Sequence, residues 1–215
     1  MQSFHGYHHD IKPRNLLIRG ADFILADFGL SRLKPEDEPT QTNWKDSTYE
    51  YGAPECRDPH TFRPGIIGRA LDIWSLGCVF LEFSIWLLHG PETIKKFAGA
   101  RGTGRSSTDG SRPLYQVTDK ATKAAKVHQL VIWTIKCLQD DPRCKGDTAL
   151  AALLNLIKDH MLQPEVKKRY WAADVGKELE EIIWKAKERD SYLFNSCDNL
   201  DIPSPNFEHF QSVQD

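Results

Sequence analysis

The chain has 215 residues, of which 40% are hydrophobic and 27% are charged, and its formal net charge at pH 7 is −2. This length and apolar content suffice for the buried core of one domain or two small ones. The nearly balanced charge gives no electrostatic reason to expect binding to nucleic acid or to an acidic membrane surface.

The cysteines and the first residues indicate the compartment. There are five cysteines, an odd number with no Cys-x-x-Cys pair, which favours reduced thiols over a disulfide framework or a zinc site. The opening sequence MQSFHGY has no charged leader followed by an apolar run, so we expect no signal peptide. We therefore expect an intracellular protein, in the cytoplasm or the nucleus.

The first candidate site is the run His8–Asn15, with the sequence HHDIKPRN. Phosphoryl transfer needs a positioned acceptor hydroxyl, a cation on the moving phosphate and magnesium held by oxygen ligands. Asp10 can accept or orient the proton of the hydroxyl, Lys12 can neutralise the phosphoryl group, and Asn15 can ligate the metal. The run therefore predicts phosphoryl-transfer chemistry.

Three histidines near Asp10 raise a second interpretation, which is a metal site formed by His5, His8 and His9. No second cluster of ligands at zinc-like spacing occurs elsewhere in the sequence. Phosphoryl transfer is therefore the favoured interpretation of this region.

Two short apolar segments follow, Asn15–Ile18 and Phe23–Ala26, with Arg19–Asp22 between them. Their composition and spacing predict a β-hairpin. Such a hairpin would carry Asp27, a second candidate magnesium ligand, back towards Asp10. Taken alone, an Asp-Phe-Gly tripeptide like the one that Asp27 begins is typical of a turn.

Residues 30–52 are polar and contain two prolines in the run KPEDEP, which predicts a loop. The segment holds several hydroxyl groups that could accept phosphate: Ser31, Thr40, Thr42, Ser47, Thr48, Tyr49 and Tyr51. The simpler interpretation, that most of them are ordinary polar residues of a loop, is favoured.

The apolar run Ile73–Leu88 predicts a helix. Asp72 precedes the run and Glu82 interrupts it, and it is too short for a membrane span, so we expect a buried helix of a globular core. Apolar residues at helical spacing predict three more helices, over residues 127–138, 149–162 and 172–189.

Two segments have the composition of irregular chain. Residues 98–113 are rich in Gly and Ser, which predicts a flexible insertion, and their glycines do not fit the phosphate-binding pattern Gly-x-Gly-x-x-Gly. Residues 191–215 contain no Lys or Arg and four acidic residues, which predicts a polar, acidic tail.

Three motifs together resemble those of eukaryotic protein kinases of the serine/threonine type. The run HHDIKPRN is similar to the catalytic loop, with His9 where an arginine is usual. Asp27-Phe28-Gly29 resembles the magnesium-binding motif, and Ala53-Pro54-Glu55 resembles the motif that closes the activation segment. The occurrence of all three in the family's order makes coincidence untenable.

The resemblance implies a kinase-like α+β fold, of which this chain would be the mostly α-helical C-terminal lobe with a small β-hairpin near the N-terminus. Only nine residues precede Asp10, so we expect the ATP-binding N-terminal lobe to be missing or supplied by a partner chain. The implied divisions are a lobe over residues 1–190, with catalytic loop 8–15, activation segment 27–55 and insertion 98–113, and an acidic tail over 191–215.

The implied activity is transfer of the γ-phosphate of ATP to a Ser or Thr hydroxyl of a protein substrate, with Mg²⁺. Asp10 would be the catalytic base, Lys12 the partner of the phosphate, and Asn15 and Asp27 the magnesium ligands. The alternative is a catalytically inactive kinase-like fragment that acts as a protein-binding module. We expect neither a nucleic-acid nor a membrane partner.

The resemblance also implies supporting roles. His8 would be structural, Thr48 would contact Asp10 and Lys12, and Asp72 would accept backbone hydrogen bonds from the catalytic loop. Arg169 is expected to form an ion pair with Glu55.

The histidine at position 9 carries a separate expectation. With a reference pKa of about 6.5, His9 would hold only part of a positive charge at neutral pH, whereas the usual arginine holds all of it. We therefore hypothesise that phosphorylation of the activation segment, at Thr40, Thr42 or Ser47, controls this chain weakly or not at all.

Overall fold

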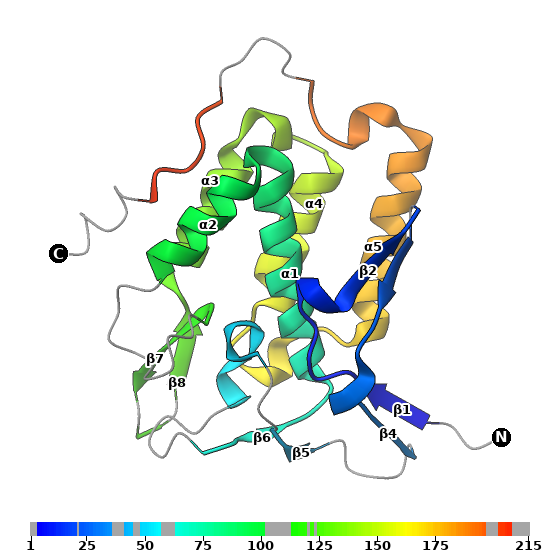
Figure 1. The fold of residues 1–215 in the computed structure, drawn as a ribbon. Coiled ribbons are helices and arrows are strands. Elements are labelled where there is room, and N and C mark those ends of the chain that lie inside the picture. The colour runs from blue at the N-terminus through cyan, green and yellow to red at the C-terminus, as the bar shows by residue number, and fades with distance from the viewer. Residues whose placement is uncertain are drawn as a thin grey trace.

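The computed structural model describes residues 4–20, 22–35, 41–44, 48–56, 63–101, 113–119, 121–122, 124–196 and 202–207. The predicted fold class is confirmed: the chain is mostly α-helical, with small antiparallel sheets that include a hairpin near the N-terminus (Figure 1).

The core forms around one long helix, α1 (Ala70–His89), which runs through the middle of the helical part (Figure 1). By length and composition α1 could cross a membrane, but 67% of that apolar segment is buried inside the protein. It is therefore the buried core helix that the sequence predicted. Gly77 permits its close approach to the π-helical turn Ile157–Met161, since a Cβ at position 77 would lie 3.0 Å from Cβ of Met161.

The three helices predicted in the second half of the chain are confirmed. They are α3 (Gln129–Asp140), α4 (Ala149–Leu156), which continues as a π-helical turn over Ile157–Met161, and α5 (Ala172–Glu188). Side-chain caps begin two of them: His128 accepts a hydrogen bond from the Leu130 amide, and Thr148 accepts one from the Ala151 amide.

Two boundaries in this half were predicted wrongly. Val127 does not begin a helix but ends strand β8 (Ala124–Val127), which pairs with β7 (Tyr115–Asp119) in a hairpin that the sequence did not reveal. The predicted insertion 98–113 starts too early, because residues 98–100 belong to α2 (Pro91–Ala100). Helix α2 begins with a proline, which suits a first helical position, and buries Phe97 and Ala100 in the core. Residues 102–112 lie outside the described part of the chain.

The N-terminal hairpin is present as predicted: β2 (Leu16–Arg19) pairs antiparallel with β3 (Asp22–Leu25), Leu16 opposite Leu25. Two further strand pairs contradict the prediction that residues 30–52 are all loop. Strand β4 (Arg32–Pro35) pairs with β1 (Phe4–Tyr7), and β5 (Thr42–Asn43) pairs with β6 (Ile66–Ile67). Backbone pairing with distant segments therefore overrides the polar composition.

Part of the predicted tail packs on the core. Phe207 is buried, and its ring lies 5.8 Å from that of Phe97 and 5.7 Å from that of Trp133, between ring centres. The four acidic residues of the tail, Asp198, Asp201, Glu208 and Asp215, lie outside the described residues.

Candidate active site

The segment between β1 and β2 is held in place by Asp72, in the first turn of α1. The carboxylate of Asp72 accepts hydrogen bonds from the backbone amides of His8, at 2.6 Å, and His9, at 2.8 Å. Burial raises the pKa of Asp72, and these two hydrogen bonds oppose the rise. The bonding that the kinase resemblance implied for Asp72 is therefore present, and it fixes the loop that leads into Asp10.

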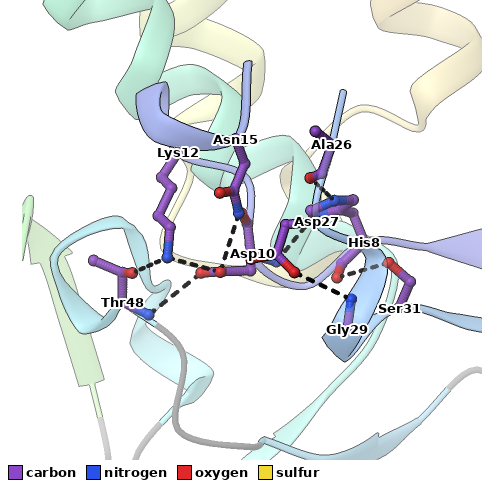
Figure 2. Close-up of polar contacts among 9 residues, drawn as sticks. All are labelled: His8, Asp10, Lys12, Asn15, Ala26, Asp27, Gly29, Ser31 and Thr48. Carbon is purple, nitrogen blue, oxygen red and sulfur yellow. Dashed lines mark hydrogen bonds and ion pairs between the residues drawn. The ribbon is translucent and has the colours of Figure 1, made fainter. Parts of the chain in front are cut away.

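The side chain of His8 ties the same loop to the hairpin. Its Nε2 lies 2.9 Å from the carbonyl oxygen of Ala26, and its Nδ1 accepts a hydrogen bond from the Asp10 amide at 3.3 Å (Figure 2). Both ring nitrogens are thus engaged, which leaves none to bind a metal ion. Within the described residues, no three or more His, Cys, Asp or Glu side chains gather as a metal site.

The carboxylate of Asp10 lies at the centre of the site (Figure 2). One oxygen, Oδ2, accepts from Lys12 Nζ at 2.8 Å and from Asn15 Nδ2 at 3.1 Å. The other, Oδ1, accepts from the Thr48 amide at 3.4 Å. Asn15 Nδ2 also donates to the backbone carbonyl of Asp10 at 2.8 Å. Because both oxygens have fixed partners, the orientation of the carboxylate is set before any substrate arrives.

Lys12 joins two distant parts of the chain. Its ammonium lies 2.8 Å from Asp10 and also donates to Thr48 Oγ1 at 2.8 Å, across 36 positions of sequence (Figure 2). The contacts expected of Thr48 with Asp10 and Lys12 are therefore both present. This places a cation, a carboxylate and a hydroxyl within hydrogen-bond distance of one another.

Asp27 begins a short 3₁₀ turn, Phe28–Leu30, and has a positive φ of 62°, which is uncommon for a residue with a side chain. Its carboxylate accepts from the Gly29 amide at 3.4 Å and is otherwise exposed (Figure 2). The amide nitrogen of Asn15 is committed to Asp10. The atoms of the two residues that remain for a ligand are therefore oxygens, the donor type that magnesium prefers.

His9 is uncharged at neutral pH, whereas the sequence led us to expect a partial positive charge. It is buried, stacks on Tyr7 with 4.1 Å between ring centres, and has a positive φ of 66°. Burial, followed by the positive charge of Arg32, lowers the pKa of His9 to about 4. Of the three phosphorylation sites named in the hypothesis about His9, Thr40 and Ser47 lie outside the described residues and Thr42 lies in β5.

The predicted ion pair between Glu55 and Arg169 is confirmed. Arg169 donates from Nη1 to Oε1 at 2.5 Å and from Nη2 to Oε2 at 2.8 Å. Its side chain is fully buried, and it also donates to backbone carbonyls, including that of Ala70 at 3.1 Å. The pair connects the segment that follows Thr48 to Ala70, the first residue of α1.

Sequence reasoning missed a second set of contacts around Thr48. The 3₁₀ turn Tyr49–Tyr51 is held to α1, because Tyr51 donates its hydroxyl to Glu82 at 2.9 Å and Ser75 donates to the Tyr51 carbonyl at 2.9 Å. Tyr51 and Glu82 are 31 positions apart in sequence, and Tyr51 and Ser75 are 24 positions apart. The only local signal was Glu82 itself, an acid inside an apolar helix, which needs a buried partner.

Comparison with known proteins agrees with these motifs. A family model described as the protein kinase domain matches residues 3–178. Mitogen-activated protein kinase 8 of Oryza sativa subsp. japonica is 42% identical over 81 residues, 35% of this chain and 13% of that kinase. Mitogen-activated protein kinase 19 of Arabidopsis thaliana is 38% identical over 85 residues, 38% of this chain and 14% of that kinase. The match therefore spans only about an eighth of the length of these relatives.

Proposed function

This chain belongs to the protein kinase family, and we propose that it carries the part of a serine/threonine kinase that aligns the acceptor hydroxyl of a protein substrate with the transferred phosphoryl group. One observation carries the proposal. Lys12 Nζ lies 2.8 Å from both Asp10 Oδ2 and Thr48 Oγ1. A base and a cation in such contact are what transfer of a phosphoryl group to a hydroxyl requires.

Asp10 is the group that orients the substrate hydroxyl and accepts its proton. Its carboxylate is nearly buried, with 9% of the side chain exposed. It cannot rotate freely, because Asn15, Lys12 and the Thr48 amide hold it from different sides. A base fixed in this way loses little entropy when the hydroxyl docks, which favours a reactive geometry.

Lys12 supplies the positive charge that neutralises the phosphoryl group during its transfer. Its side chain is 20% exposed, so the residue is not sealed off from solvent. Its ammonium also donates to the hydroxyl of Thr48. An ammonium has three donors, so two can stay with Asp10 and Thr48 while the third meets a phosphate oxygen.

Asn15 and Asp27 are the proposed magnesium ligands, and their free donor atoms fit this role, since both are oxygens. Magnesium bound there would neutralise charge on the phosphates of ATP. Asp27 is exposed and held only by the Gly29 amide among the described residues, so its carboxylate can turn towards a cation without breaking a buried contact.

The test is phosphotransfer from radiolabelled ATP with Mg²⁺ to a mixture of Ser- and Thr-containing peptides. Asp10→Asn removes the base, and we expect the rate to fall by about 10² to 10⁴-fold. Asp22→Asn, an exposed residue of the neighbouring hairpin, makes the same chemical change away from the site and should leave the rate unchanged. Equal rates for Asp10→Asn and the unchanged chain would overturn the proposal.

A further inference from the structure

A cluster of charged side chains surrounds the buried Arg101 beside the turn that follows Thr48. Arg101, directly after α2, places its Nη2 at 3.1 Å from Glu50 Oε1 and at 3.7 Å from Glu82 Oε1. Glu82 also accepts the hydroxyl of Tyr51 at 2.9 Å. Three elements, namely the turn that holds Glu50 and Tyr51, helix α1 and the end of α2, therefore meet at one guanidinium.

The position of Arg101 is fixed by its surroundings. Its side chain has no exposed surface, and its guanidinium carbon lies 4.4 Å from the centre of the Phe97 ring. Within the described part of the chain, its Nε and Nη1 have no hydrogen-bond partner. A buried cation with few hydrogen bonds is tolerated only beside compensating carboxylates. The guanidinium and the two glutamates are thus bound to one another.

Glu50 is the link between this cluster and the active site. It lies two residues after Thr48 in the 3₁₀ turn, where the Tyr51 amide donates to the Thr48 carbonyl at 3.1 Å and the Gly52 amide donates to the Tyr49 carbonyl at 3.0 Å. A shift of Glu50 therefore moves the turn as a unit. Thr48, at its start, would move with it and change both the contact with Asp10 and the contact with Lys12.

We propose that Arg101 is a positioning residue of the active site. Through Glu50 and Glu82 it holds the turn Tyr49–Tyr51, and with it Thr48, in contact with Asp10 and Lys12. The catalytic consequence rests on the function proposed above, whereas the positioning itself does not. The end of α2 is thereby connected to the chemistry, although it lies outside the sequence motifs that identify the site.

The test measures backbone amide exchange by NMR in the full chain, residue by residue, for Arg101→Met. We expect exchange at Thr48, Tyr51 and Gly52 to become at least about tenfold faster, because the turn opens more often. Amides of α4 and of the β2–β3 hairpin should keep their rates. Arg189→Met, which removes an exposed pair with Asp147 at 2.9 Å, is the matched control and should change none of the three amides.

Two further variants separate positioning from general stability. Arg101→Lys keeps the charge and should restore part of the protection at Thr48. Glu50→Gln should loosen the same three amides, and the double variant Arg101→Met with Glu50→Gln should exceed neither single variant by much, because both break one interaction. If Arg101→Met does not fold, the exchange rates of Glu50→Gln alone test the proposal. Glu50 is 35% exposed, so the chain tolerates this substitution better.

Unchanged exchange at Thr48, Tyr51 and Gly52 in a folded variant would overturn the proposal, as would a uniform increase over the whole chain. Phosphotransfer is then measured on the same samples. Loss of protection with a lower kcat and an unchanged KM for ATP supports the catalytic consequence. Loss of protection in a chain that shows no phosphotransfer at all leaves the positioning intact and counts against the proposed function instead.

Discussion

Glu55 and Arg169 form a two-pronged ion pair although 114 positions separate them in the sequence. The arginine is fully buried, and its guanidinium carbon also lies 5.1 Å from the centre of the Trp74 ring. One side chain thus connects the end of the segment that carries Thr48, the N-terminal part of α1 and the chain before α5. The ion pair therefore ties the end of the segment that carries Thr48 to the helical core.

Arg169→Met should destabilise the chain by about 3 to 5 kcal/mol, because it leaves the carboxylate of Glu55 without its partner. The free energy of unfolding in urea measures this. Arg189→Met, at an exposed ion pair, should cost less than about 1 kcal/mol. A loss for Arg169→Met as small as that of the control would show that the pair contributes little to the core.

The motifs and the regular helices were accessible from sequence because each depends on residues close together in the chain. The catalytic-loop motif is one continuous run, His8–Asn15. A continuous apolar run predicted α1, and apolar residues at helical spacing predicted α3, α4 and α5. The ion pair of Glu55 with Arg169 came from family resemblance, since no local pattern encodes a contact over such a separation.

The features that sequence reasoning missed depend on contacts between distant segments. Arg101 falls at the edge of a glycine-rich stretch, so composition indicated flexible chain, whereas the packing of Phe97 and the two glutamates orders it. The β7–β8 hairpin has short, mixed strands, Tyr115–Asp119 and Ala124–Val127, without clear alternation. The positive φ of His9 and its lowered pKa likewise follow from burial that only the folded chain creates.

Stability should fall as the pH is lowered from about 6.5 to about 4, partly because of His9. In this range the unfolded chain binds a proton at His9 that the folded chain does not, so protonation favours unfolding. His9 lowers the free energy of unfolding by at most about 3 kcal/mol. This loss builds up as the pH falls from about 6.5 and is nearly complete at about pH 4, the folded pKa of His9. His128, whose pKa burial and Arg101 also lower to about 4, acts in the same direction.

The measurement is the free energy of unfolding at several pH values for the unchanged chain and for His9→Asn. Asparagine tolerates a positive φ and does not titrate, which makes it a suitable replacement. We expect a shallower pH dependence between pH 4 and 6.5 in the variant. An identical slope in both proteins would mean that His9 is protonated equally in the folded and unfolded states.

Phosphorylation of the activation segment should have little effect on phosphotransfer. A phosphate on this segment would find no cation at His9, because that ring is neutral and buried. Glutamate at Thr40, Thr42 or Ser47 should therefore leave the rate close to that of the matching alanine variant. A strong increase with glutamate at any of the three would contradict this expectation and indicate a different cationic partner.

The central claim is that Asn15 and Asp27 hold magnesium for nucleotide beside Asp10 and Lys12. Thermal unfolding with Mg²⁺ and ATP, in the unchanged chain, in Asp27→Ala and in the exposed control Asp22→Ala, tests it most directly. At about 100 times the dissociation constant, the ligand should stabilise the unchanged chain and the control by about 2.7 kcal/mol, and Asp27→Ala not at all. No stabilisation of the unchanged chain, or equal stabilisation of all three proteins, would contradict the account.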